Sequence, residues 1–179
     1  MVLPNIGQLS TAGSDEILRP VKPWFIVATL ILALALNVMP LSGVALALRP
    51  DFIALVLLYW CIQEPRYVGV GVAWTIGLLM DVGDATLFGQ HALAYSLLAY
   101  AGIVLHRRVR MFALTAQVLH IIALLLMTSV VVLTIRALAG SEFPGFVYFA
   151  GSFIGGALWP LMVALFRMPQ RPQPDPDHA

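Results

Sequence analysis

Two carboxylates three positions apart, Asp81 and Asp84, have the residue types and spacing most suited to chemistry. Carboxylates this close can bind a cation or act as an acid–base pair. No third carboxylate lies near them in the sequence. The nearest histidine, His91, follows Gly89 and Gln90 at the expected start of another helix. We therefore favour a helix end followed by a polar turn over a catalytic or metal site.

A second polar group lies in the long apolar run 111–135, where Gln117 and His120 are three residues apart. An ionisable group inside a membrane is costly and is a candidate for function. A neutral histidine hydrogen-bonded to a neighbouring helix costs less. We favour that interhelical role for His120 over a substrate path, a proton path or a metal ligand.

Motifs of known catalytic sites are missing from the sequence. There is no phosphate-binding glycine loop ending in Lys-Ser or Lys-Thr, no H-E-x-x-H and no G-x-S-x-G. The single cysteine, Cys61, provides neither a disulfide nor metal-ligand spacing. We expect no enzymatic activity, and we assign no catalytic, cofactor-binding or metal-binding residue.

The composition indicates where such residues must lie. Of 179 residues, 60% are hydrophobic and 11% are charged, against roughly 25% charged in an ordinary soluble domain. Mean hydropathy is +0.91. A soluble protein of this size cannot hide so much apolar surface. The composition excludes a soluble enzyme, a disordered chain and a nucleic-acid-binding module, and it indicates an integral membrane protein.

Six runs lack Asp, Glu, Lys and Arg: 23–48, 52–63, 67–80, 85–106, 111–135 and 143–166. A bilayer core needs about 20 helical residues, so the second and third runs are short. The second begins at Arg49-Pro50-Asp51 and ends in Tyr59 and Trp60, which suit a membrane interface. We predict an all-α, polytopic membrane protein with about six transmembrane helices. Four helices with two re-entrant segments are the alternative, as is signal-peptide cleavage after 45–47.

Basic residues predict the orientation. With both termini cytoplasmic, eight of the ten Lys and Arg residues lie inside, and only Arg49 and Arg136 lie outside. The positive-inside rule requires such a bias. We expect a flexible cytoplasmic segment over 1–22, one transmembrane domain over 23–167 and a Pro-rich, disordered cytoplasmic tail over 168–179. For the cluster Arg107, Arg108 and Arg110 we favour a solvated loop over contact with anionic lipid.

Small residues predict where helices touch. Gly69, Ala73 and Gly77 recur every four residues and lead to Asp81, so all four share one helix face. Small residues allow membrane helices to approach closely. We expect the aspartate to lie at the end of a packing stripe and not in lipid.

A second such face is the G-x-x-x-G of Gly151 and Gly155. It is followed by Trp159-Pro160, and proline there should kink the helix. We expect Pro40 to have the same effect near the end of the first helix.

Three stretches resemble the MreD family of rod shape-determining membrane proteins. They are Arg49-Pro50-Asp51-Phe52 running to Leu57-Leu58-Tyr59-Trp60, Gly77-Leu78-Leu79-Met80-Asp81 followed by 87–95, and Gly156-Ala157-Leu158-Trp159-Pro160. The resemblance covers roughly 24–167. Ala85 stands where the family commonly has glycine, and Phe88 replaces a usual leucine. Ala85 would be strained if that turn needs a positive φ.

The resemblance implies a non-enzymatic scaffold of cell-wall elongation in the bacterial inner membrane. Its partners would be MreC directly, and MreB, RodA and a class B penicillin-binding protein in a larger complex. It also implies a fold similar to the S-components of vitamin transporters, so a small-molecule carrier is the alternative function. No cofactor and no nucleic acid are implied. The residues expected at helix or partner contacts are Arg49, Asp51, Tyr59, Trp60, Gly69, Ala73, Gly77, Asp81, Gly89, His120, Gly151, Gly155, Trp159 and Pro160.

Overall fold

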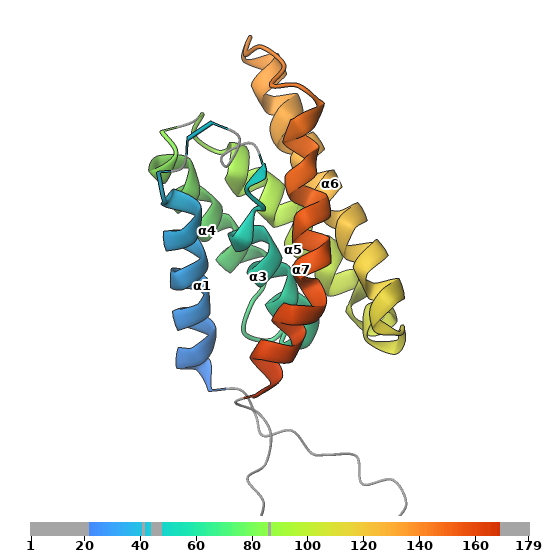
Figure 1. Ribbon diagram of the computed structural model, residues 1–179. Helices are drawn as coiled ribbons and strands as arrows, with labels where there is room; N and C mark the ends of the chain where they lie inside the picture. Colours follow the sequence, from blue (N-terminus) through green and yellow to red (C-terminus); the bar gives the residue numbers. More distant parts are fainter. Residues whose placement is uncertain (1–21, 41, 44–47, 86, 169–179) are drawn as a thin grey trace, which may run out of the picture.

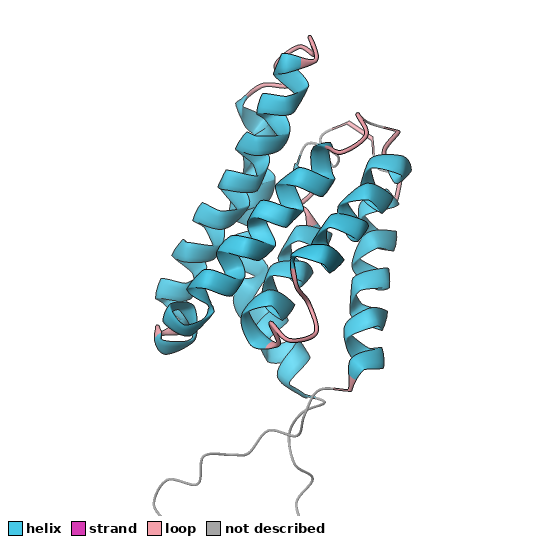
Figure 2. Cartoon of the chain, turned by 180° about the vertical axis from the view of Figure 1, so that it is seen from behind, coloured by secondary structure: helices cyan, strands magenta, loops and turns pink. Residues whose placement is uncertain are grey.

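The computed structural model describes residues 22–40, 42–43, 48–85 and 87–168. The predictions made for the N-terminal segment up to residue 21, for cleavage after 45–47 and for the tail from residue 169 lie outside these residues. Six α-helices are described: α1 (Pro23–Val38), α3 (Phe52–Gln63), α4 (Val70–Gly83), α5 (Gln90–Met111), α6 (Leu114–Leu138) and α7 (Ala150–Arg167). A 3-10 turn, Phe146–Phe149, precedes α7. The described residues contain no strand (Figure 2), which confirms the all-α prediction.

The first apolar run forms a shorter helix than expected. The run covers 23–48, but α1 ends at Val38, and Met39 already has an extended backbone with ψ 128°. The residue before a proline is driven out of the α-helical region by the proline ring. Pro40 therefore follows the helix end instead of kinking the helix, and the expectation of a kink there was wrong.

Two helical segments are long and apolar enough to cross a membrane: Leu114–Leu138, and the 22 residues Phe146–Arg167. The helices α1, α3 and α4 are apolar but shorter, and α5 has 22 residues with arginines in its last turn. By length and composition, the described residues support two spans. The arrangement of six spans stays a prediction.

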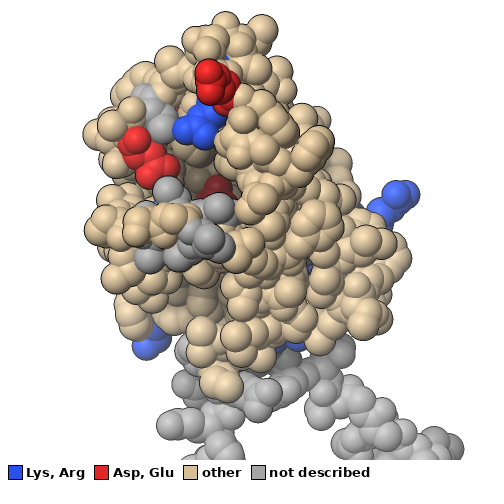
Figure 3. Space-filling model, turned by 45° about the horizontal axis from the view of Figure 1, so that its top comes forward, with Lys and Arg blue, Asp and Glu red and all other residues tan. Residues whose placement is uncertain are grey.

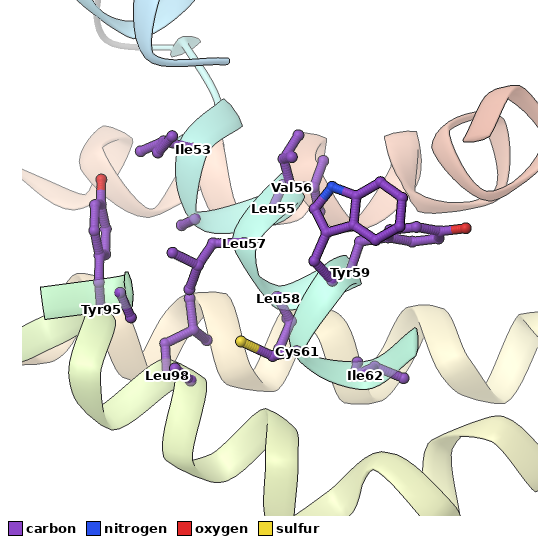
Figure 4. Packing of buried hydrophobic residues seen from close by; sticks show 14 of the residues in the cluster. Ile53, Leu55, Val56, Leu57, Leu58, Tyr59, Cys61, Ile62, Tyr95 and Leu98 are labelled. Atoms are coloured by element: carbon purple, nitrogen blue, oxygen red, sulfur yellow. The ribbon is translucent and has the colours of Figure 1, made fainter. Parts of the chain in front are cut away.

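The short helix α3 occupies the centre of the bundle, with α1, α5 and α7 packed around it (Figure 1). Ten of its twelve residues are buried. Its side chains leave the helix in several directions and meet apolar neighbours such as Leu98 of α5 (Figure 4). A helix that is apolar all round is one that other protein segments enclose. This explains why a run too short to span a bilayer is nevertheless free of charge.

Enclosure of α3 corrects the interpretation of its two aromatic residues. We expected Tyr59 and Trp60 at a membrane interface, but their side chains are 1% and 0% exposed. Trp60 stacks on Phe166 of α7 with ring centroids 5.7 Å apart. Its indole N–H donates to Thr29 Oγ1 of α1 over 2.9 Å. The aromatic pair joins helices inside the bundle, because the neighbouring helix α1 supplies Trp60 with the polar partner that an interface would otherwise provide.

The bundle has two ends that we name by a residue at each. At the Asp51 end, α3, α5 and α7 begin, and α1, α4 and α6 finish. At the Arg110 end the directions are reversed, and both described termini, the start of α1 and the end of α7, lie there (Figure 1). Arg49 and Arg136 belong to the Asp51 end, and Arg110 and Arg167 belong to the other. This grouping agrees with the charge sorting used to predict the orientation, which itself stays a prediction.

Candidate functional site

Asp51 connects three helices at the Asp51 end. Its Oδ1 accepts from the backbone N–H of Ala54, which caps the first turn of α3, and from Asn37 Nδ2 of α1 at 2.8 Å. Its Oδ2 accepts from the Tyr95 hydroxyl of α5, also at 2.8 Å. Asn37 completes the link by accepting from the N–H of Phe52. An aspartate at this position satisfies amides that a helix start leaves unpaired.

Asp81 makes a second set of bonds, between α4 and the start of α5. Its Oδ2 accepts from the N–H of Gly89 at 2.7 Å, and its Oδ1 accepts from the N–H of His91 at 2.9 Å. The ring atom His91 Nδ1 lies 2.8 Å from the same Oδ1. The Asp81 side chain is buried. A carboxylate from one helix thus caps the N-terminus of the next, where the helix dipole favours a negative charge.

This capping depends on a close approach of α4 and α5 at Gly77. A Cβ added there would lie 2.5 Å from Ala92 N and 2.6 Å from His91 O, so only glycine fits. Ala73, on the same face, is fully buried. Gly69 precedes the helix, and a Cβ there would meet nothing within 4 Å. The small-residue stripe therefore acts at Ala73 and Gly77, two turns and one turn before Asp81, and does not extend to Gly69.

The turn between α4 and α5 requires two residues with positive φ. Gly89, the N-cap of α5, has φ 99°, a conformation that glycine adopts without strain. Ala85 has φ 50°. The resemblance predicted that Ala85 would be strained if this turn needs a positive φ, and the backbone at Ala85 has that positive φ. Asp84, expected with Asp81 in a polar turn, is exposed next to it.

The residues around Asp51 line a hollow, which we name the Asp51 cavity. Its volume is about 510 Å³, and it opens at the Asp51 end, where Figure 3 shows acidic and basic atoms around a depression. Its lining residues are Asn37, Gly43, Arg49, Pro50, Asp51, Met80, Asp84, His91, Arg136, Pro144, Val147 and Tyr148. A smaller hollow of about 80 Å³ shares Arg49, Asp51, His91 and Tyr148 with it.

The glycines of α7 place that helix against the cavity wall. A Cβ at Gly151 would lie 2.6 Å from the carbonyl oxygen of Arg49, and one at Gly155 would lie 2.9 Å from Leu125 Cδ1 of α6. Ser152, between them, shares a 2.9 Å hydrogen bond with Ser129 of α6. The G-x-x-x-G face is thus used inside the bundle.

The polar contact expected of His120 is made by Gln117 instead. The Trp159 indole N–H of α7 donates to Gln117 Oε1 of α6 over 3.1 Å, and both side chains are buried. His120 Nδ1 lies 2.8 Å from the carbonyl oxygen of Ala116 in its own helix, and the ring stacks on Phe112. The expected hydrogen bond from His120 to a neighbouring helix was therefore wrong. Satisfaction within the helix is available one turn back, so no second helix is needed.

Pro160 lies inside α7, which continues without interruption to Arg167. Among the described residues, no group of three His, Cys, Asp or Glu side chains is placed to hold a metal ion. The carboxylates of Asp51 and Asp81 are both occupied by donors from the fold itself. The charged groups of the Asp51 cavity are Asp51, which hydrogen bonds hold in place, and Arg49, Arg136 and Asp84.

Sequence reasoning missed three residues of this site: Asn37, His91 and Tyr95. Asn37 has a weak signal, since an amide deep in an apolar run must find a partner. His91 was considered too distant from Asp81 in the sequence, but the tight turn brings their side chains together. Tyr95 lies one turn after His91 and fully buries its ring. A buried tyrosine hydroxyl needs an acceptor, and here that acceptor is Asp51, at the start of α3.

Comparison with known proteins gives two matches. Residues 18–169 match the family model described as rod shape-determining protein MreD. The rod shape-determining protein MreD of Haemophilus influenzae is 27% identical over 154 residues, which cover 86% of this chain and 95% of that protein. No solved structure gives a significant match. The expected likeness to S-components therefore stays a prediction.

Proposed function

Because the chain belongs to the family of the rod shape-determining protein MreD, we propose that it is a non-enzymatic scaffold of bacterial cell-wall elongation. The family and the apolar helices support a membrane protein with a role in cell shape. The finer assignment is our proposal. The chain lies in the inner membrane with both termini cytoplasmic, binds MreC directly, and joins MreB, RodA and a class B penicillin-binding protein in a larger complex.

The observation that carries this proposal is the state of two carboxylates, the buried Asp81 and the partly buried Asp51. Asp51 accepts hydrogen bonds from α1, α3 and α5, and Asp81 accepts from the start of α5. A carboxylate that accepts several hydrogen bonds from the fold is a weaker general base or nucleophile, because most of its lone pairs are already used. Both residues stabilise one arrangement of helices, which is what a docking surface needs.

The partner's contact is proposed at the mouth of the Asp51 cavity. Arg49, Arg136 and Asp84 line it, and they belong to the connection before α3, to α6 and to the end of α4. In the predicted orientation this end faces the periplasm. A partner with one membrane helix and a periplasmic segment can place that segment over the cavity while its helix lies against the bundle. Charges on the partner that are opposite to Arg49, Arg136 and Asp84 would fix the position in which it docks.

Capture of MreC by the tagged full-length chain tests this contact. Arg136→Glu should reduce capture by about tenfold, since it reverses one charge at the cavity mouth. The matched control is Arg107→Glu, which makes the same change on the exposed surface of α5 at the Arg110 end. Equal capture by both variants would remove the cavity mouth from the interface.

The cell-shape role needs its own test. Depletion of the protein should convert rods to round cells, and the wild-type chain should restore rods. The scaffold proposal would be contradicted if the purified chain captured no MreC and if depletion left the cell shape unchanged.

The alternative function, a carrier of a small molecule, is favoured by one observation. The Asp51 cavity has about 510 Å³, within the range of about 300–1,000 Å³ typical of ligand sites. A carrier predicts a metabolite retained through purification, detected by mass spectrometry and lost in Tyr148→Ala. Absence of any retained molecule would count against it.

A further inference from the structure

A second hollow lies at the opposite end of the bundle, where four helices meet. It has a volume of about 200 Å³, and we name it the Arg110 pocket. Its lining residues are Tyr59, Ile62 and Gln63 of α3, Val109 and Arg110 of α5, Gln117 of α6 and Arg167 of α7. The pocket lies at the last turn of α3, and part of its lining, Tyr59, Ile62 and Val109, belongs to the buried core.

The charges of this pocket have one sign. Arg110 and Arg167 come from different helices, and no Asp or Glu is among the lining residues. Within the described part of the chain, neither guanidinium forms an ion pair or a hydrogen bond. Each arginine lies in the last turn of its helix, where it suits the helix dipole. The helix dipole explains the position of each arginine in its own helix. It does not explain why two arginines line the same hollow with no acidic residue beside them.

The floor of the pocket is polar and held in place. Gln117 is buried, and its amide group is fixed at both atoms: Nε2 donates to the Phe112 carbonyl at 2.9 Å, and Oε1 accepts from Trp159. Val109 is also buried beside it. The two arginines therefore share a hollow with an amide that two hydrogen bonds hold in one orientation.

Apolar side chains flank both arginines on the outer surface. Met111, next to Arg110, is 79% exposed, and Met168, next to Arg167, is 63% exposed. A ligand with a charged head and a hydrocarbon tail would satisfy both features: the head between the guanidiniums and the tail along the methionines. Arginine's planar fork matches phosphate oxygens in pairs.

We propose that the Arg110 pocket binds the phosphate of an anionic phospholipid headgroup through Arg110 and Arg167. The site is separate from the Asp51 cavity and from the proposed partner contact. All three arginines of α5 are exposed, but Arg110 lines the pocket, whereas Arg107 and Arg108 do not. The three arginines, which the sequence presents as one basic cluster, thus divide into one that lines the proposed binding site and two that do not.

The test uses the delipidated full-length chain in detergent, with dioleoyl phosphatidylglycerol as the probe. Native mass spectrometry counts bound lipid, and the thermal unfolding midpoint reports stabilisation. Arg110→Gln with Arg167→Gln should weaken lipid binding by roughly tenfold or more, because both charge-assisted contacts are lost. The matched control, Arg107→Gln with Arg108→Gln, removes the same charge and should change binding by less than about twofold.

The remaining arms identify the source of the phosphate. Dioleoyl phosphatidylcholine should bind more weakly than phosphatidylglycerol, and millimolar inorganic phosphate should not displace the lipid. Displacement by inorganic phosphate would keep the phosphate site but assign it to a soluble ligand. Equal loss in both double variants, no phosphatidylglycerol binding, or tighter binding of polyglutamate than of lipid would each overturn the proposal. Size-exclusion profiles and helical circular dichroism establish that the variants are folded.

Discussion

Replacing Gly77 with alanine should destabilise the bundle although it adds one methyl group. The new Cβ would lie 2.5 Å from Ala92 N, whereas ordinary contact begins at 3.4 Å, so α4 and α5 must separate by about 0.9 Å. The His91 N–H, which donates to Asp81 Oδ1 at 2.9 Å, would then be about 3.8 Å away, beyond hydrogen-bond range. One methyl group thus damages both the packing and the helix cap.

The magnitude follows from three terms. Overpacking against backbone costs about 1–3 kcal/mol. Loss of a hydrogen bond to a charged group costs about 1.5–3 kcal/mol. Alanine regains roughly 1 kcal/mol over glycine inside a helix. The net loss in the free energy of unfolding is about 1.5–5 kcal/mol.

Unfolding in mixed detergent micelles, followed by circular dichroism, measures this loss. The matched control is Gly71→Ala on the same helix, where a Cβ would meet nothing within 4 Å. It should be neutral or stabilising by up to about 1 kcal/mol. Asp81→Asn should cost at least about 1 kcal/mol less in the Gly77→Ala background than in the wild type, because the bond from the His91 N–H to the Asp81 carboxylate is already broken there. Equal stability of the two glycine variants, or strict additivity with Asp81→Asn, would refute the reasoning.

Three further outcomes are expected from unfolding and labelling experiments. Ala85→Gly should stabilise the protein by about 1 kcal/mol, because Ala85 has φ 50°, which glycine adopts without strain. The control Ala28→Gly, on the exposed face of α1, should destabilise the protein by a similar amount. A change of the same sign in both variants would contradict backbone strain at Ala85. Gln117→Leu should lower the free energy of unfolding by about 1–3 kcal/mol, because it leaves the Trp159 N–H without its acceptor. If Gln117→Leu lowers it by the same amount in the Trp159→Phe background, the hydrogen bond is not stabilising. Cys61 is 0% exposed and should react with a maleimide only after unfolding, so rapid labelling of the folded chain would contradict the enclosure of α3.

The sequence predicted helix positions better than helix surroundings. Charge-free runs located all six described helices, since a chain in lipid must satisfy its backbone within each segment. Those runs do not say which of them touches lipid. The second run was expected to span with Tyr59 and Trp60 at an interface, and it is instead the enclosed centre of the bundle. Periodicity carries no information about a helix that is apolar on every side.

Within the site, local rules succeeded and distant pairings failed. The spacing from Ala73 to Asp81 correctly placed the aspartate beyond a close helix contact, because helix geometry fixes that face. The bonds from Asp51 to Asn37 and Tyr95 join residues 14 and 44 positions apart. Such bonds depend on how helices pack, which one sequence does not determine. His120 was favoured over Gln117 because it is ionisable, although the amide, with a donor and an acceptor, was better suited to join two helices.

The length of α3 has an electrical consequence. Its twelve residues rise about 18 Å, and a hollow lies beyond each of its ends. If water fills both hollows in the membrane-embedded protein, the insulating layer along this axis is roughly 1.7 times thinner than a bilayer core of about 30 Å. A membrane voltage then falls over that shorter path, so the field along α3 is correspondingly steeper than in the surrounding lipid. Nearly the full membrane voltage would then lie between a charge bound in one hollow and a charge bound in the other.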